Sequence, residues 1–299
     1  MNIIKNNRLK VIILLLTITL GKESIAQVAP HKTQFFENNA LINPAYVGAK
    51  ATGSGVLTYA SQWNKVEGSP KVISAVINTP LSEKSGIGIS FLNDKAGLIN
   101  RTTVLAAYSY KVRFNETSAI RFGLGAGLIN DKFSRSDINS PNSSSDPAFN
   151  NYNNRHGLSW KAVTGAIFTN RKFEAQLSWH DLNNQLSNRT NTVNDPGLTA
   201  SVSYKINLLD SVNFRSLVGI RQVNGYGSYY DIGFNAEYLR LLNLTALYHT
   251  NKSLTFGLGL NLRDRTRFVF LYGTQSSQQG SEMGESYEIL LAVPFRLKR

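Results

Sequence analysis

The chain of 299 residues contains no cysteine, so no disulfide bond can stabilise its fold. Charged residues make up only 17% of the sequence, below the share of about a quarter in typical soluble domains. A nucleophile elbow of the Gly-x-Ser-x-Gly type and a phosphate-binding loop are both missing. The histidines lie too far apart to be neighbouring zinc ligands: His31, His156, His180 and His249. The sequence therefore predicts neither a metal site nor a cofactor.

Long apolar runs are also missing, because a membrane-spanning helix needs about 20 apolar residues and no segment reaches that length. The longest run, residues 11–20, follows the basic residues Lys5, Arg8 and Lys10 and precedes Ser24-Ile25-Ala26. This order of basic, apolar and small residues is typical of a secretory signal peptide. We predict a cleaved signal peptide at residues 1–26 and an exported mature chain.

The formal net charge is +13, a strong positive excess. A basic protein can bind nucleic acid, but an exported one meets anionic lipid headgroups, polysaccharides or acidic partners instead. We therefore expect no nucleic-acid partner.

Apolar and polar residues alternate with a period of two along most of the mature chain. In residues 102–114, for example, Val104 and Tyr108 lie on one face, and Thr103 and Lys111 lie on the other. About 14 such segments, each of about 9 to 11 residues, are long enough to cross a bilayer as tilted strands. They start near Thr52, Lys71, Gly86, Thr102, Ala119, Leu158, Phe173, Leu198, Val212, Tyr229, Asn243, Leu254, Arg267 and Tyr287.

The expected loops alternate in length along the chain. Residues 130–157, 181–197 and 275–286 follow odd-numbered strands, whereas short connections such as 169–172 follow even-numbered strands. Outer-membrane barrels have short periplasmic turns and longer external loops. A soluble β-sandwich or propeller would carry more charge on its polar faces than the glycine, serine, threonine and asparagine found here.

We therefore expect an all-β fold, a transmembrane outer-membrane β-barrel of about 14 antiparallel strands. The barrel is predicted at residues 51–299, and residues 27–50 form an N-terminal segment in the periplasm or the lumen. Charged residues of both signs fall on the inward faces, where pairing would narrow or plug the pore. These residues are Lys111, Arg113, Arg121, Lys205, Arg215, Arg221 and Arg263, with Glu174, Asp231, Glu237 and Glu288.

An outer-membrane lipid hydrolase is the enzyme alternative, because Ser178 and His180 lie two residues apart on one face of a strand. That face also carries Glu174 and Gln176 and is predicted to point into the lumen. A lipid hydrolase needs its reactive pair at the lipid boundary. We therefore favour a structural role for this pair and expect no enzyme activity.

Several short motifs occur in one order along the mature chain. They are Gln34-Phe35-Phe36, Asn43-Pro44-Ala45-Tyr46-Val47-Gly48, Gln62-Trp63 with Gly68 and Pro70, Gly86-Ile87-Gly88, Tyr108-Ser109-Tyr110, residues 122–127, Asp146-Pro147 and Ser286-Tyr287-Glu288-Ile289. In this combination the chain resembles the PorP/SprF family, outer-membrane components of the type IX secretion and gliding motility system of Bacteroidetes. The C-terminal Arg299 departs from the aromatic residue on which barrel proteins commonly end.

The resemblance implies a non-enzymatic barrel in the outer membrane that supports secretion or surface attachment of a large cognate protein. Its implied partners are outer-membrane lipids, periplasmic type IX secretion components and that secreted or surface-anchored protein. The residues expected to bind a partner are Phe35, Asn43, Pro44, Tyr46, Gly48, Gln62 and Trp63. The alternative is an outer-membrane porin or transporter that conducts small molecules.

Overall fold

The computed structural model describes residues 34–133, 157–180, 182, 196–209, 211–223, 227–262, 265–274 and 284–296. The predicted signal peptide and most of the three long loops lie outside these residues. No helix within the described ranges is long and apolar enough to cross a membrane.

Fourteen strands form the structure, and each predicted start agrees with an observed one within three residues. The strands are β1 (Gly53–Ser61), β2 (Lys71–Pro80), β3 (Ser85–Ala96), β4 (Ile99–Arg113), β5 (Ser118–Phe133), β6 (Gly157–Asn170), β7 (Phe173–Trp179), β8 (Pro196–Leu209), β9 (Val212–Val223), β10 (Gly227–Tyr238), β11 (Leu242–His249), β12 (Leu254–Asn261), β13 (Arg267–Gly273) and β14 (Ser286–Phe295).

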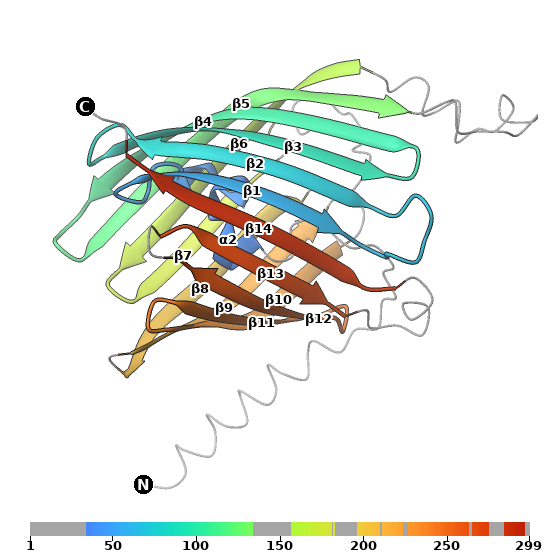
Figure 1. Cartoon of the computed structure of the whole chain (residues 1–299). Helices are drawn as coiled ribbons and strands as arrows, with labels where there is room; N and C mark the ends of the chain where they lie inside the picture. The colour runs from blue at the N-terminus through green and yellow to red at the C-terminus, as the bar shows by residue number, and fades with distance from the viewer. Residues whose placement is uncertain are drawn as a thin grey trace, which may run out of the picture.

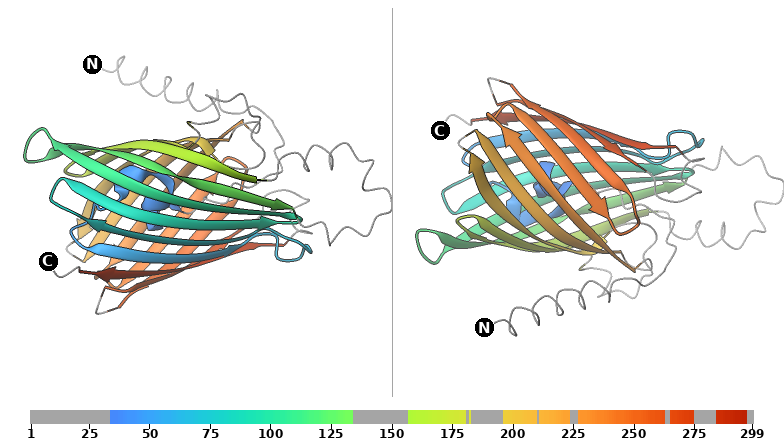
Figure 2. Two further views of the ribbon diagram at one scale, coloured as in Figure 1. Left: turned by 90° about the horizontal axis from the view of Figure 1, so that it is seen from above. Right: turned by 90° about the horizontal axis from the view of Figure 1, so that it is seen from below.

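The strands form a closed antiparallel barrel in chain order, with β14 paired to β1 from Gly53↔Phe295 to Ser61↔Tyr287 (Figures 1 and 2). Closure leaves no edge strand, so each strand is hydrogen-bonded to a neighbour on both sides, as a hydrocarbon environment requires. The fold class predicted from the alternation is confirmed.

The expected uniform strand length was wrong. β5 has 16 residues, whereas β7 and β13 have seven each. A bilayer limits only the part of a strand that faces lipid. The β4–β5 ladder continues to the pair Ile99↔Phe133, which takes β5 beyond the predicted start of its loop at residue 130.

The two faces of the strands differ as the alternation predicts. Leu258 and Tyr204 retain 51% and 46% of their accessible surface and point outward, in the direction of lipid. Inward-facing positions carry small polar side chains such as Ser109 on β4 and Thr199 on β8, which are 0% and 1% exposed. The barrel is apolar outside and largely polar inside.

The two ends of the barrel differ in their connections. At the short-turn end, β2 and β3 are joined by residues 81–84 and β6 and β7 by residues 171–172. At the long-loop end, β5 and β6 are separated by residues 134–156 and β13 and β14 by residues 274–285. The longest connections therefore follow odd-numbered strands, as predicted, although β3 and β4 at the same end are joined by residues 97–98 alone.

An N-terminal segment lies inside the barrel, as both views in Figure 2 show. It consists of α2 (Gln34–Glu37), α3 (Asn39–Ile42) and the 3-10 turn η1 (Pro44–Tyr46), and we call residues 34–48 the plug. Phe35, Phe36 and Ile42 of the plug form a buried apolar cluster with Leu217 on β9 and Leu247 on β11. Of the two predicted places, periplasm and lumen, the structure shows the lumen.

Candidate functional site

The Asn-Pro step in the plug starts the η1 turn. Asn43 has an extended backbone, with φ −148° and ψ 113°, as expected for a residue that precedes proline. Its side-chain Oδ1 accepts a hydrogen bond of 2.9 Å from the backbone N–H of Ala45. Pro44 occupies the first position of the turn, where no backbone N–H is needed. Asn43 and Pro44 together fix where the turn begins.

The amide of Asn43 also joins the plug to the barrel wall. Its Nδ2 donates to the carbonyl of Leu177 and to Oε1 of Gln176, both at 3.2 Å. The side chain of Asn43 is buried, so these bonds replace those that water would make. Gly165 on the neighbouring strand β6 faces this amide, and a Cβ on Gly165 would collide with Asn43 Oδ1.

A second glycine on the wall accommodates the backbone of η1. A Cβ built on Gly123 of β5 would overlap the backbone of Pro44 and Ala45. At Gly125, two residues farther along β5, the nearest atom to such a Cβ is 3.6 Å away, which is an ordinary contact. Only the first of these two inward-facing glycines is therefore required by the plug.

The end of the plug is bound to β2, β3 and β4. The backbone N–H of Gly48 donates to Asn78 Oδ1 at 3.1 Å, and the Ser109 hydroxyl donates to the carbonyl of Val47 at 2.5 Å. Gly48 has φ +61°, a left-handed conformation that favours glycine. It also lies against Gly86 at the start of β3, so both positions exclude a larger residue.

Tyr46 forms a hydrogen bond with the start of β7. Its hydroxyl donates to Glu174 Oε1 at 2.8 Å. Burial and then the negative charge of Glu174 raise the pKa of the Tyr46 hydroxyl far above its ordinary value. Tyr46 thus remains a neutral hydrogen-bond donor at any physiological pH.

At the start of the plug, Glu37 forms an ion pair with Arg267 at the start of β13, with a distance of 3.2 Å between Oε1 and Nη2. The Glu37 side chain is 1% exposed. Burial raises the pKa of the Glu37 carboxyl, and the charges of Arg267, Lys50 and Arg215 oppose part of this rise. The plug therefore contains a carboxylate whose charge is costly to bury.

The predicted partner-binding residues fall into two separate groups. Phe35, Asn43, Pro44, Tyr46 and Gly48 belong to the plug, and their contacts are with the barrel wall. The other two, Gln62 and Trp63, follow β1 at the long-loop end, where Gln62 is buried and Trp63 is half-buried. The first strand ends at Ser61, one residue before Gln62. The role of all seven residues in partner binding stays a prediction.

Sequence reasoning did not identify the residues that hold the plug. The barrel contributes polar groups from Asn78, Ser109, Glu174, Gln176 and Arg267. Inward-facing glycines gave a partial signal, since the alternate glycines of residues 123–127 suggest a close approach from across the lumen. The close approach at Gly123 is by the plug backbone.

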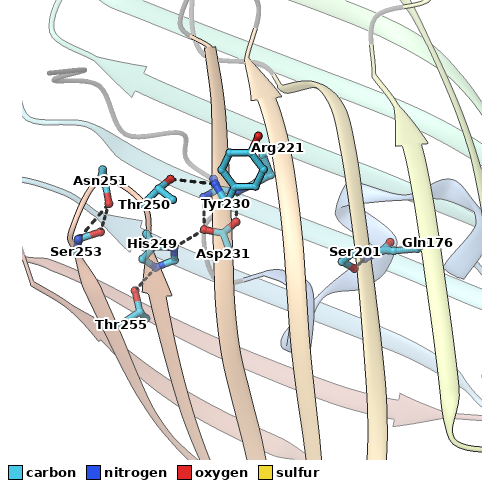
Figure 3. A network of polar contacts seen from close by, with 10 residues as sticks. All are labelled: Gln176, Ser201, Arg221, Tyr230, Asp231, His249, Thr250, Asn251, Ser253 and Thr255. Atoms are coloured by element: carbon cyan, nitrogen blue, oxygen red, sulfur yellow. Dashed lines mark hydrogen bonds and ion pairs between the residues drawn. The ribbon is translucent and has the colours of Figure 1, made fainter. Parts of the chain in front are cut away.

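Near the long-loop end, the wall carries a buried polar network of Arg221, Asp231, His249 and Thr255 (Figure 3). Arg221 on β9 donates to both carboxylate oxygens of Asp231 on β10, at 2.7 and 2.9 Å. Nδ1 of His249 lies 2.5 Å from Asp231, and its Nε2 lies 2.9 Å from the Thr255 hydroxyl. The network ties β9 to β12, and the bonds from Arg221 to Asp231 are charge-assisted.

Ser178 and His180 do meet, with 3.2 Å between Ser178 Oγ and His180 Nε2. Both side chains are buried on the inward face, as predicted, and Ser178 Oγ also lies 3.3 Å from the carbonyl of Thr164. A lipid hydrolase would need this pair at the lipid boundary. The barrel wall separates Ser178 and His180 from that boundary. The described residues contain no group of three or more His, Cys, Asp or Glu that could hold a metal ion.

Comparison with known proteins places the chain in a family. Residues 24–293 match the family described as type IX secretion system membrane protein PorP/SprF. The chain belongs to the PorP/SprF family. The match covers both the plug and the barrel, and none of the curated proteins matches the chain.

Solved structures share the barrel fold at low sequence identity. The CymD monoaromatic hydrocarbon channel is 11% identical, with a TM-score of 0.53, over 93% of this chain and 96% of that one. The Ralstonia pickettii toluene transporter TbuX is 10% identical, with a TM-score of 0.51, over 92% and 97%. The KdgM porin is 12% identical, with a TM-score of 0.41, over 81% and 99%. The likenesses to CymD and TbuX show the fold alone.

Family membership makes the chain a membrane component of type IX secretion. A closed antiparallel barrel with an apolar outer face is the architecture of outer-membrane proteins. The family is of a secretion kind and not of an enzymatic kind.

Proposed function

We propose that the chain is a docking component of the type IX secretion and gliding system, which supports the secretion or surface attachment of a cognate exported protein. The plug in the lumen is the observation that carries this proposal. It contacts β2, β3 and β4 through Val47 and Gly48, and β6 and β7 through Asn43. On other parts of the wall it contacts β9, β11 and β13.

A segment that contacts the wall on so many strands fills much of the cross-section of the lumen. A barrel of this size cannot pass a folded adhesin even when empty. The proposed mechanism is therefore attachment: the barrel anchors the exported protein and the periplasmic secretion components while the plug keeps the membrane sealed. We assign the short-turn end to the periplasm and the long-loop end to the exterior, by the usual pattern of such barrels.

Replacement of Pro44 and Tyr46 by alanine tests the role of the plug in docking. Neither residue belongs to the strand ladder, so the barrel should keep its heat-modifiable mobility on gels. Surface display of the cognate protein should fall, because the η1 turn loses its fixed start and its bond to Glu174. Loss of heat modifiability would make the segment structural. Normal results in both assays would make it dispensable.

A small-molecule porin or transporter is the second candidate, favoured by the fold that the chain shares with the CymD channel. Planar bilayers separate the two functions. A large and stable open conductance of the intact chain supports the porin. Rare openings, which become frequent when residues 34–48 are deleted, support the sealed dock.

A further inference from the structure

Charge is distributed unevenly along the inner wall of the barrel. At the long-loop end, inward-facing charges of both signs are nearly balanced: Asp94, Arg101, Asp131, Lys161, Arg221, Asp231 and Glu288. Arg101 pairs with Asp131 at 2.7 Å, and Arg221 pairs with Asp231 at the same distance. The charges of these arginines are thus compensated within the wall.

The short-turn end is different. The charges that face the lumen there are mainly positive: Lys50, Lys111, Arg113, Arg121, Lys205, Arg215 and Arg267, against Glu37, Glu174 and Glu237. We call this set the basic vestibule. Arg267 is paired with Glu37, and Tyr46 occupies one oxygen of Glu174. Within the described part of the chain, Arg113, Lys205 and Arg215 form no ion pair.

Like charges in the vestibule lie close enough to repel one another. Lys111 and Arg121 are directly opposite each other on β4 and β5, and Lys205 and Arg215 are directly opposite each other on β8 and β9. Cross-strand pairs of like charge destabilise a sheet. Burial, and then the charge of Arg267, lowers the pKa of Lys50. This arrangement is unfavourable for the barrel alone, and a bound anion would relieve it.

The vestibule is open to solvent but closed to lipid. Arg113 and Lys205 are exposed, whereas their chain neighbours Val112 and Tyr204 point outward. Inward-facing side chains cannot reach lipid headgroups around the barrel. An anionic partner must therefore enter through the short-turn mouth, and it must be narrow enough to lie between the wall and the plug.

We propose that the basic vestibule binds an acidic polypeptide segment that enters the short-turn end of the barrel. An extended chain with several carboxylates can pair with the cations on β4, β8 and β9 at once. Association through such a charged funnel is fast and weakens with salt. This inference rests on the proposed function, since it defines the chemistry by which a type IX partner is recognised.

The test uses the full-length barrel in neutral detergent and a short fluorescent oligoglutamate peptide as the probe. Fluorescence anisotropy measures the dissociation constant of the peptide at several salt concentrations. The vestibule variant combines Arg113→Glu with Lys205→Glu. The matched control combines Lys65→Glu with Lys71→Glu, two exposed lysines at the long-loop end, and makes the same change in net charge.

We expect the vestibule variant to bind the peptide at least about tenfold more weakly and the control variant to bind as the parent does. Equal weakening in both variants would show general attraction to a basic protein and overturn the inference, as would absence of binding to the parent. Competition by phosphatidylglycerol as strong as competition by unlabelled peptide would identify lipid as the ligand and also overturn it. If the vestibule variant loses heat modifiability, Arg113→Gln with Lys205→Gln replaces it.

Surface display of the cognate protein separates this inference from the proposed function. Deletion of the chain could abolish display while the vestibule variant binds the peptide as the parent does. In that case only the inference is wrong. If deletion leaves display intact, the proposed function is wrong whatever the peptide does.

Discussion

At the scale of single residues, the plug is specified by a few side chains with exacting surroundings. The sequence predicts a turn at Asn43-Pro44, because this dipeptide is a turn initiator, and the structure contains a turn there. The partners of Asn43 could not be predicted, since Gln176 and Leu177 are more than 130 positions away in the chain. Local rules give the turn in the plug, whereas the contacts of the plug depend on the closed barrel.

Gly123→Ala should loosen the plug. The added Cβ would overlap the backbone of Pro44 and Ala45, which cannot move as a flexible side chain would. Overpacking of this kind costs about 1 to 3 kcal/mol. We expect more frequent openings in planar bilayers and faster proteolysis of the N-terminal segment. Gly125→Ala is the control, because a Cβ there meets only ordinary contacts. Equal effects of the two variants would refute the idea that Gly123 leaves room for the backbone of η1.

Protonation of Glu37 should make docking of the plug in the lumen depend on pH. Burial holds the pKa of its carboxyl above the ordinary value of 4.5 while the plug is docked. A raised pKa means that the docked plug binds the proton more tightly than the released plug does. Docking is therefore most stable below pH 4.5 and weakens as pH rises through the raised pKa.

Bilayer conductance, measured from acid to neutral pH, checks this expectation. Openings of the parent should become more frequent as pH rises, whereas Glu37→Gln should remove the change in this range. Glu67→Gln, on an exposed loop residue at the long-loop end, is the matched control and should behave as the parent. A parent conductance that is independent of pH would contradict the proposed cost of burying Glu37.

At the scale of the strands, the sequence predicts nearly everything that the bilayer imposes. Alternation identifies all fourteen strands and their outward faces, because lipid on one side and a polar lumen on the other impose a period of two. The length of each strand cannot be predicted from this alternation. The 16 residues of β5 depend on how far its ladders with β4 and β6 continue beyond the lipid, which no local pattern encodes.

Leu258→Arg on β12 should hinder insertion. Leu258 is 51% exposed on the outer face near the middle of its strand, so arginine would meet the acyl chains. The penalty near the midplane of a bilayer is about 2 to 4 kcal/mol and falls toward the interfaces. Folding yield in lipid vesicles measures it. Leu262→Arg, just past the end of the same strand, is the matched control and should have a much smaller effect. An unchanged yield for Leu258→Arg would place that residue away from lipid.

At the scale of the whole molecule, the difference between the two ends of the barrel connects its structure to the proposed docking. The short-turn end carries the basic vestibule and the N-terminal segment, whereas the long-loop end carries the paired charges and the longest connections. The family could be recognised from ordered motifs spread over the chain. The charge asymmetry could not, because it appears only when residues from β4 to β13 are placed around one mouth.

The orientation of these two ends in the outer membrane can be tested by cysteine labelling, because the native chain contains no cysteine. Lys65 lies in the connection between β1 and β2 at the long-loop end, and Lys84 lies in the connection between β2 and β3 at the short-turn end. Both lysines are exposed, so Lys65→Cys and Lys84→Cys form a matched pair on adjacent hairpins. A membrane-impermeant maleimide should label only Lys65→Cys on intact cells and both variants after lysis. The reverse pattern on intact cells would show that the basic vestibule faces the medium. In that orientation it could not bind a partner from the periplasm.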